Sequence, residues 1–165
     1  MSYEAKKVSN LILSRAGELR TGVTNLRLNK LLYLVHGWSL THSEGGMIRN
    51  HFEAWKLGPV VKTIFDQARA FGDQPISRPF AHLNYETGRS QPVPFDVIEN
   101  SHRELIMRVV VYYDDWSTYQ LVDLTHESGG PWETVIRNDT SATIRIPHEL
   151  IAAHFRAKLG DSVRN

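Results

Sequence analysis

The sequence predicts a single, mainly α-helical domain with a minor extended component, a fold of the α+β type. The 165 residues suffice for one domain with its own core, and the 41% hydrophobic and 22% charged residues are typical of a soluble globular protein. Apolar residues recur at helical spacing in several separate segments, whereas alternation typical of strands is confined to short ones. We expect one domain over residues 1–160, followed by a frayed tail at 161–165.

Charge and composition exclude several classes of protein. A net charge of +1 does not favour a strong attraction to nucleic acid or to an anionic membrane. The chain has no cysteine, which excludes disulfides, thiolate metal sites and cysteine nucleophiles. No apolar run approaches the length of a membrane span, and the first residues lack the apolar core of a signal peptide. We therefore expect a soluble, cytoplasmic protein without a membrane partner.

Two helices are expected before the first glycine-rich turn. The first covers about residues 3–19 and stops near Thr21-Gly22. The second starts at Thr24 as its cap and runs to about Thr41. Its apolar positions extend over more than one face, which predicts a central helix packed on several sides. Gly37 interrupts it, and the expected benefit is the close approach of a neighbouring element.

The middle of the chain mixes short elements with a long connection. Residues 43–46 are a turn signal, and residues 47–55 predict a short strand or hairpin arm. Gly58-Pro59 predicts a helix start, with the proline at the first helical position and Gly72 ending the helix. Residues 73–94 contain four prolines and little periodicity, so we expect an irregular, adaptable surface segment there.

Helices return in the second half. Ser101 with Glu104, and Ser117 with Gln120, are capping-box patterns that predict two helix starts. Pro131 suits the first position of a brief helix ending near Asn138. Residues 142–146 predict a short strand, and a last helix is expected from Pro147 to about Gly160.

The histidines do not form a metal site by spacing. His148 and His154 are six positions apart, a rotation of about 600° that puts the two rings on different helix faces. His36 and His42 have the same spacing, and His42 with His51 implies no third ligand. We therefore predict no metal and no cofactor.

Catalytic candidates are equally weak. His126, beside Asp123 and Glu127, suits either a general base or the end of a helix, where an imidazole can bond the last carbonyls. The structural role is favoured because no nucleophile accompanies it. Asp114 and Asp115 are adjacent, which favours solvated side chains over an acid–base pair. No phosphate loop or nucleophile elbow is present. We predict no catalytic residue and no enzymatic activity.

Two ordered motif sets resemble the Panacea antitoxin domain family, which includes SocA-like antitoxins and phage-associated GepA-like proteins. The similarity extends from about Lys7 to Phe155, but residues 73–94 match no pattern of the family. The residues that carry it are Lys30, Leu31, Leu32, Tyr33, Gly37, Ala54, Trp55, Gly58, Pro59, Val60, Thr125, His126, Pro131 and Trp132.

The resemblance implies a mainly α (α+β) fold, a single compact helical domain with a small antiparallel β element. It also implies an antitoxin without enzymatic activity that binds a cognate protein toxin encoded by a neighbouring gene. A related role is that of an adaptor delivering the toxin to a bacterial AAA+ protease. The motif residues are expected to be mainly structural, and toxin contacts are expected at residues 73–94 or at exposed aromatic side chains.

Two alternatives from other functional classes remain. Arg20, Arg27 and Lys30 lie close in sequence, as in a DNA-binding regulator of its own operon, although the net charge of +1 argues against strong binding. The other alternative is a hydrolase that depends on His126.

Overall fold

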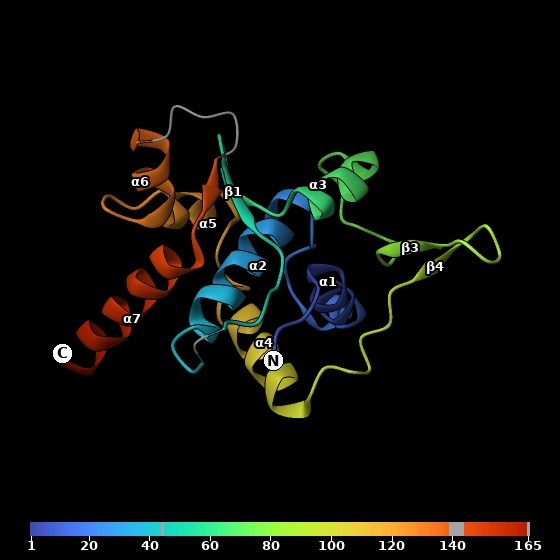
Figure 1. Cartoon of the computed structure of the whole chain (residues 1–165), viewed down its shortest axis with the longest axis horizontal. Helices are drawn as coiled ribbons and strands as arrows, with labels where there is room; N and C mark the ends of the chain where they lie inside the picture. The colour runs from blue at the N-terminus through green and yellow to red at the C-terminus, as the bar shows by residue number, and fades with distance from the viewer. Residues whose placement is uncertain (44, 139–143, 165) are drawn as a thin grey trace.

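The chain is organised around one central helix, α2 (Asn25–Ser39), in a computed structural model that describes residues 1–43, 45–138 and 144–164. Nearly every residue of α2 is buried. It contacts α1 (Ala5–Ser14), α3 (Lys62–Ala68) and α4 (Asn100–Tyr112), and also the shorter elements described below (Figure 1). The expected central helix is confirmed, and the Thr24 side chain caps it by accepting a hydrogen bond from the Arg27 amide.

A small antiparallel sheet packs against α2. Its strands are β1 (Phe52–Trp55), β2 (Gly58–Val60) and β5 (Arg145–Ile146), in the order β2-β1-β5. Together with the helices it confirms the predicted mainly α fold with a small β element. The turn expected at 43–46 includes Glu44, and the strand expected at 142–146 includes residues 142–143; these positions lie outside the described residues.

The predicted helix start at Gly58-Pro59 is wrong. Pro59 lies in β2 opposite Ala54, and α3 begins only at Lys62. The amide of Ala54 points to the other side of β1, where it donates to the Ile144 carbonyl, so the ladder needs no donor from Pro59. An edge strand tolerates proline for this reason. The helix itself ends in a 3-10 turn, η2 (Arg69–Phe71), followed by Gly72 at φ +59°, as expected.

The segment at residues 73–94 is not irregular throughout. It contains a second antiparallel pair, β3 (Ala81–Asn84) and β4 (Arg89–Pro92), which projects from the body of the molecule (Figure 1). Gly88 at φ +68° allows the turn, and the Asn84 side chain accepts from the amides of Glu86 and Thr87. The hairpin is largely exposed and therefore lacks the buried alternation from which strands are predicted.

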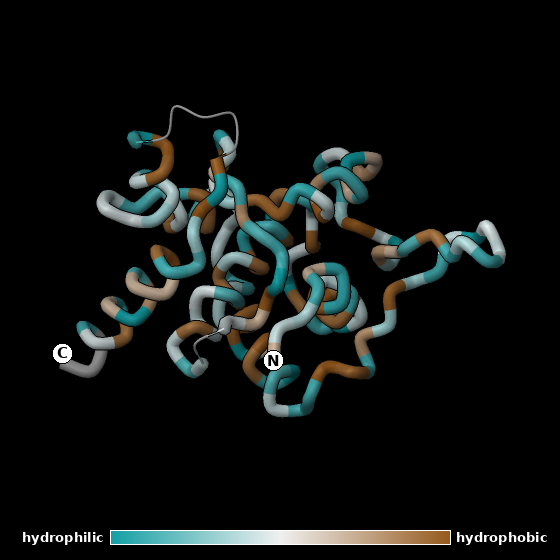
Figure 2. The backbone as a smooth tube through the Cα atoms, viewed as in Figure 1, coloured by the Kyte–Doolittle hydropathy of each residue, from teal (hydrophilic) through white to brown (hydrophobic). Residues whose placement is uncertain are grey.

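The remaining helices are α5 (Thr118–Thr125), α6 (Pro131–Asn138) and α7 (His148–Arg164); a 3-10 turn, η1 (Ala16–Glu18), follows α1. The capping box of Ser117 and Gln120 is confirmed. The one predicted at Ser101 and Glu104 is wrong, because α4 begins earlier and Glu99 is its cap. Helix α7 also continues through Gly160. Hydrophobic and hydrophilic residues alternate along it (Figure 2).

None of the helices in the described ranges is long and apolar enough to cross a membrane.

Candidate functional site

One group of motif residues builds the core around α2. Their buried members are Leu31, Leu32, Tyr33, Ala54 and Val60. Gly37 shows why its position excludes a larger residue: a Cβ atom there would lie 2.2 Å from the Phe155 ring. The close approach expected from the sequence is therefore real, and α7 makes it.

A second group of motif residues meets around a buried lysine. The Lys30 side chain is fully buried and its Nζ donates to the Pro59 carbonyl at 2.5 Å. Burial lowers the pKa of Lys30 to about 7. Gly58, at φ +104°, packs so closely that a Cβ atom would lie 2.6 Å from Thr125 Oγ1 and 2.9 Å from Lys30 Cε. The Gly58-Pro59 end of β2 therefore packs directly on the Lys30 side chain.

The other side of this junction is aromatic. The ring of His126 stacks on Trp132 with centroids 3.7 Å apart, and Trp132 Nε1 donates to the Trp55 carbonyl at 2.7 Å. His126 is the C-cap of α5, the position expected from the sequence. Its Nε2 is buried and has no hydrogen-bond partner among the described residues. Burial, and secondarily the Lys30 charge, lower the pKa of His126.

These contacts join α2, the β1–β2 hairpin, α5 and the start of α6. The side chains are packed against one another rather than arranged around an open cleft. In the described part of the chain, no group of three or more His, Asp or Glu side chains has the geometry to hold a metal ion.

The structure also pairs two histidines that sequence spacing does not connect. Nε2 of His36 lies 2.7 Å from Nδ1 of His148. The amide of Ile48 donates to Nδ1 of His36, which therefore carries no proton on that nitrogen. The ring of His51 lies 5.6 Å from that of His148. Since α2 and α7 are distant in sequence, no local signal reveals this pair.

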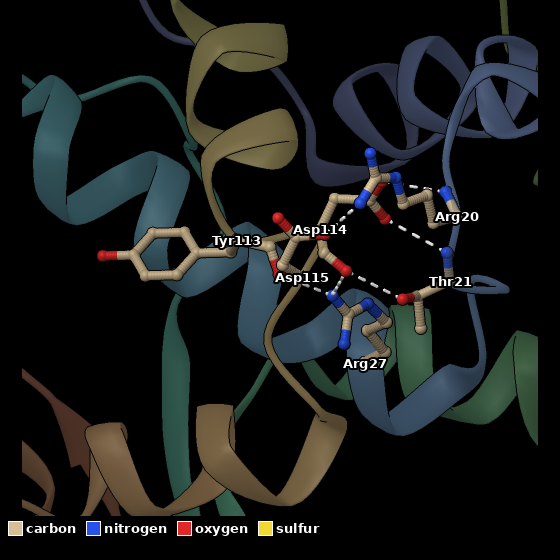
Figure 3. Close-up of polar contacts among 6 residues, drawn as sticks. All are labelled: Arg20, Thr21, Arg27, Tyr113, Asp114 and Asp115. Atoms are coloured by element: carbon tan, nitrogen blue, oxygen red, sulfur yellow. Dashed lines mark hydrogen bonds and ion pairs between the residues drawn. The ribbon is translucent and has the colours of Figure 1, made fainter.

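The basic residues considered for DNA binding are mostly inaccessible. Arg27 is buried, and its guanidinium donates to the carbonyl of Tyr113 (Figure 3) and to that of Trp116, both at 2.7 Å. Burial lowers the pKa of Arg27, and the nearby Asp114 carboxylate opposes this effect. Lys30 is buried as well. Of the three, only Arg20 is exposed, and it pairs with Asp115 at 3.0 Å.

The expected solvation of the two aspartates is therefore wrong for one of them. The Asp114 carboxylate accepts from the amides of Arg20 and Thr21, at 2.8 and 3.1 Å, and so ties the end of α4 to the loop before α2 (Figure 3). Asp115 remains exposed, with 76% of its side chain accessible.

An open groove lies between α4 and the outer part of α7. It has a volume of about 540 Å³. Trp38 of α2 is only half-buried and contributes to the groove. The other apolar lining residues are Leu105, Val109, Tyr112 and Tyr113, and the polar ones are His42, Arg108, Lys158 and Asp161. We call this surface the α4–α7 groove.

Comparison with known proteins gives a consistent assignment. The family described as "Antitoxin SocA-like, Panacea domain" matches residues 28–133. The chain is 32% identical to the antitoxin SocA of Caulobacter vibrioides over 162 residues, which covers 94% of this chain and 84% of that protein. No solved structure matches significantly.

Proposed function

The chain belongs to the family of SocA-like antitoxins with a Panacea domain, and from this premise we propose that it neutralises a cognate protein toxin by binding it directly. The observation that carries the proposal is the similarity to antitoxin SocA along 94% of the chain. The toxin is expected to be the product of a neighbouring gene, and the complex is expected to form in the cytoplasm.

The arrangement of the motif residues supports binding over catalysis. Lys30, Gly58 and Thr125 pack against one another and are buried, so a substrate has no access to them. His126 is occupied by stacking on Trp132. We therefore propose that the protein has no enzymatic activity and needs no cofactor. His126→Ala is expected to lower stability while toxin neutralisation persists at a temperature at which the variant is folded. Loss of neutralisation by a fully folded variant would instead favour the alternative of a hydrolase that depends on His126.

The same packing argues against a DNA-binding role. Arg27 and Lys30 are committed to backbone carbonyls inside the protein. Phosphate contacts require accessible cations. A filter-binding titration with duplex DNA is expected to show no salt-dependent retention.

The direct test is co-expression with the protein encoded by the adjacent open reading frame. We expect that protein alone to arrest growth, co-expression to restore growth, and the two proteins to co-purify. A harmless neighbour, or one that stays toxic in the presence of the antitoxin, would contradict the proposal.

Toxin abundance separates the two modes of neutralisation. If binding suffices, the toxin accumulates in co-expressing cells and remains neutralised. If the chain acts as an adaptor, the toxin disappears in cells with an intact AAA+ protease and accumulates in cells that lack it.

A further inference from the structure

The α4–α7 groove has an apolar stripe with helical spacing. Leu105, Arg108, Val109 and Tyr112 stand at positions i, i+3, i+4 and i+7 of α4 and all line the groove. The stripe spans about 10 Å of helix axis at 1.5 Å per residue. Tyr112 is 66% exposed, which leaves a large aromatic side chain uncovered at the end of this stripe. Such a side chain is typical of an interaction site.

The opposite wall comes from the part of α7 that leaves the body of the protein. Ile151, Ala152 and Phe155 anchor the first half of α7. Among the described residues after Phe155, none is fully buried, and this part of α7 extends away from the other helices (Figure 1). Lys158 and Asp161 face the groove from it. Lys158 is held by Glu127 at 2.7 Å.

Two charges on the rim remain without a partner. Arg108 on the α4 wall and Asp161 on the α7 wall make no ion pair or hydrogen bond within the described part of the chain. They lie on opposite sides of an apolar floor. A complementary ligand therefore carries an acidic group on one flank, a basic group on the other and apolar side chains between them.

The groove fits a helix better than a strand. Its walls are helices, whose side-chain ridges interlock with those of a third helix, and it offers no sheet edge to which a strand could add. A second copy of the chain fits poorly. In a two-fold pairing of α4 stripes, Arg108 of each copy would lie near its own equivalent, and like charges repel.

We infer that the α4–α7 groove binds an amphipathic helix of the toxin, with apolar side chains on Leu105, Val109 and Tyr112 and an acidic residue against Arg108. This inference rests on the proposed function and specifies the surface that performs it.

A second hollow, between α1 and the segments on either side of the β3–β4 hairpin, carries no such inference. It has a volume of about 790 Å³ and lies beneath residues 76–79 and 92–96. Two of its polar side chains already have partners: Asn10 bonds to Phe80 and Val93, and Arg103 bonds to the carbonyls of residues 95, 96 and 98. These bonds tie the segment to α1 and α4.

Binding measurements with matched variants test the inference. The probe is the purified product of the adjacent open reading frame, titrated by calorimetry against the full chain. Tyr112→Ala is expected to weaken binding at least about tenfold, since an aromatic anchor is lost. Its control is Tyr119→Ala, because Tyr119 is 65% exposed but lies outside the groove. Arg108→Glu is expected to weaken binding similarly, and Lys56→Glu, at an exposed position between β1 and β2 outside the groove, to leave it unchanged.

The outcomes separate the inference from the proposed function. If wild-type chain does not bind the probe, both fail. If wild-type chain binds and the groove variants bind equally well while folded by circular dichroism, only the groove assignment is overturned.

A photo-crosslinking residue at position 112 identifies the occupant. A crosslink to a toxin segment with apolar residues at helical spacing supports the inference. A crosslink to a second copy of this chain, or to a toxin segment without helical spacing, overturns it.

Discussion

His36 and His148 share a hydrogen bond of 2.7 Å between Nε2 and Nδ1, which links the central helix to the start of α7. Because the Ile48 amide donates to Nδ1 of His36, the shared proton resides on Nε2 of His36 and His148 accepts it. A proton added to either ring at these nitrogens would set two N–H groups against each other. The link therefore requires both rings to be neutral.

This pair predicts a loss of stability in mild acid. Burial lowers the pKa of His36 from 6.5 to about 3, with a smaller effect of His148. Burial also lowers the pKa of His148, with His51 lowering it further and Glu149 opposing. Below about pH 6.5 the unfolded chain therefore binds more protons than the folded chain. His36 alone lowers the free energy of unfolding by about 1.5 kcal/mol between about pH 6.5 and pH 5.

Urea unfolding at about pH 7 and pH 5 measures this effect. His36→Gln is expected to reduce the difference between the two pH values, because glutamine does not titrate. His82→Gln, at an exposed position, is the control and should retain the wild-type difference. If His36→Gln shows the same difference in free energy of unfolding between the two pH values as wild type, the assignment of the pH effect to His36 is refuted.

The buried Lys30 predicts a change in stability above neutral pH. Its pKa is about 7 in the folded protein against 10.5 as the ordinary value. Between these values the unfolded chain binds more protons, so the free energy of unfolding rises with pH by up to about 1.4 kcal/mol per unit. Lys30→Met should lose this rise between about pH 7 and pH 9.5. The exposed Lys56→Met should keep it; equal slopes for both variants would contradict the prediction.

Two glycines in helices predict opposite responses to alanine. In Gly37→Ala the new Cβ atom meets the Phe155 ring at 2.2 Å, so overpacking should cost about 1–3 kcal/mol. At Gly160 in α7 a Cβ atom meets nothing within 4 Å, and alanine should stabilise the helix by up to about 1 kcal/mol. Thermal denaturation of the two variants compares them directly, and a stabilised Gly37→Ala would be inconsistent with the packing.

The buried Arg27 predicts a large loss of stability from a single substitution. Arg27→Met leaves the carbonyls of Tyr113 and Trp116 without their donors inside the protein, which should cost about 3 kcal/mol. Arg20→Met is the matched control, since its ion pair with Asp115 is exposed and should change the midpoint of denaturation little. Similar midpoints for the two variants would show that Arg27 is not a structural residue.

Local signals in the sequence identified much of the helical framework. Apolar residues on several faces of the segment around Leu31 predicted a central helix, because burial on all sides leaves no polar stripe. Ser117 and Gln120 predicted a capping box, since both partners lie within one turn. Patterns of the same kind gave wrong predictions of a helix start at Ser101 and at Pro59. There an equally suitable local sequence adopts another conformation because of its tertiary contacts.

The sequence by itself determined the family and the mainly helical class, because both depend on the order and spacing of residues near one another in the chain. Only the tertiary structure decided which charged groups are exposed to solvent and so accessible to a binding partner. Arg27 and Lys30 are buried donors and Arg20 is exposed, although all three are basic residues near the start of α2. It also brought His36 to His148 and placed Tyr112 beside a groove. These relationships depend on contacts between distant segments, whose energies no local pattern contains.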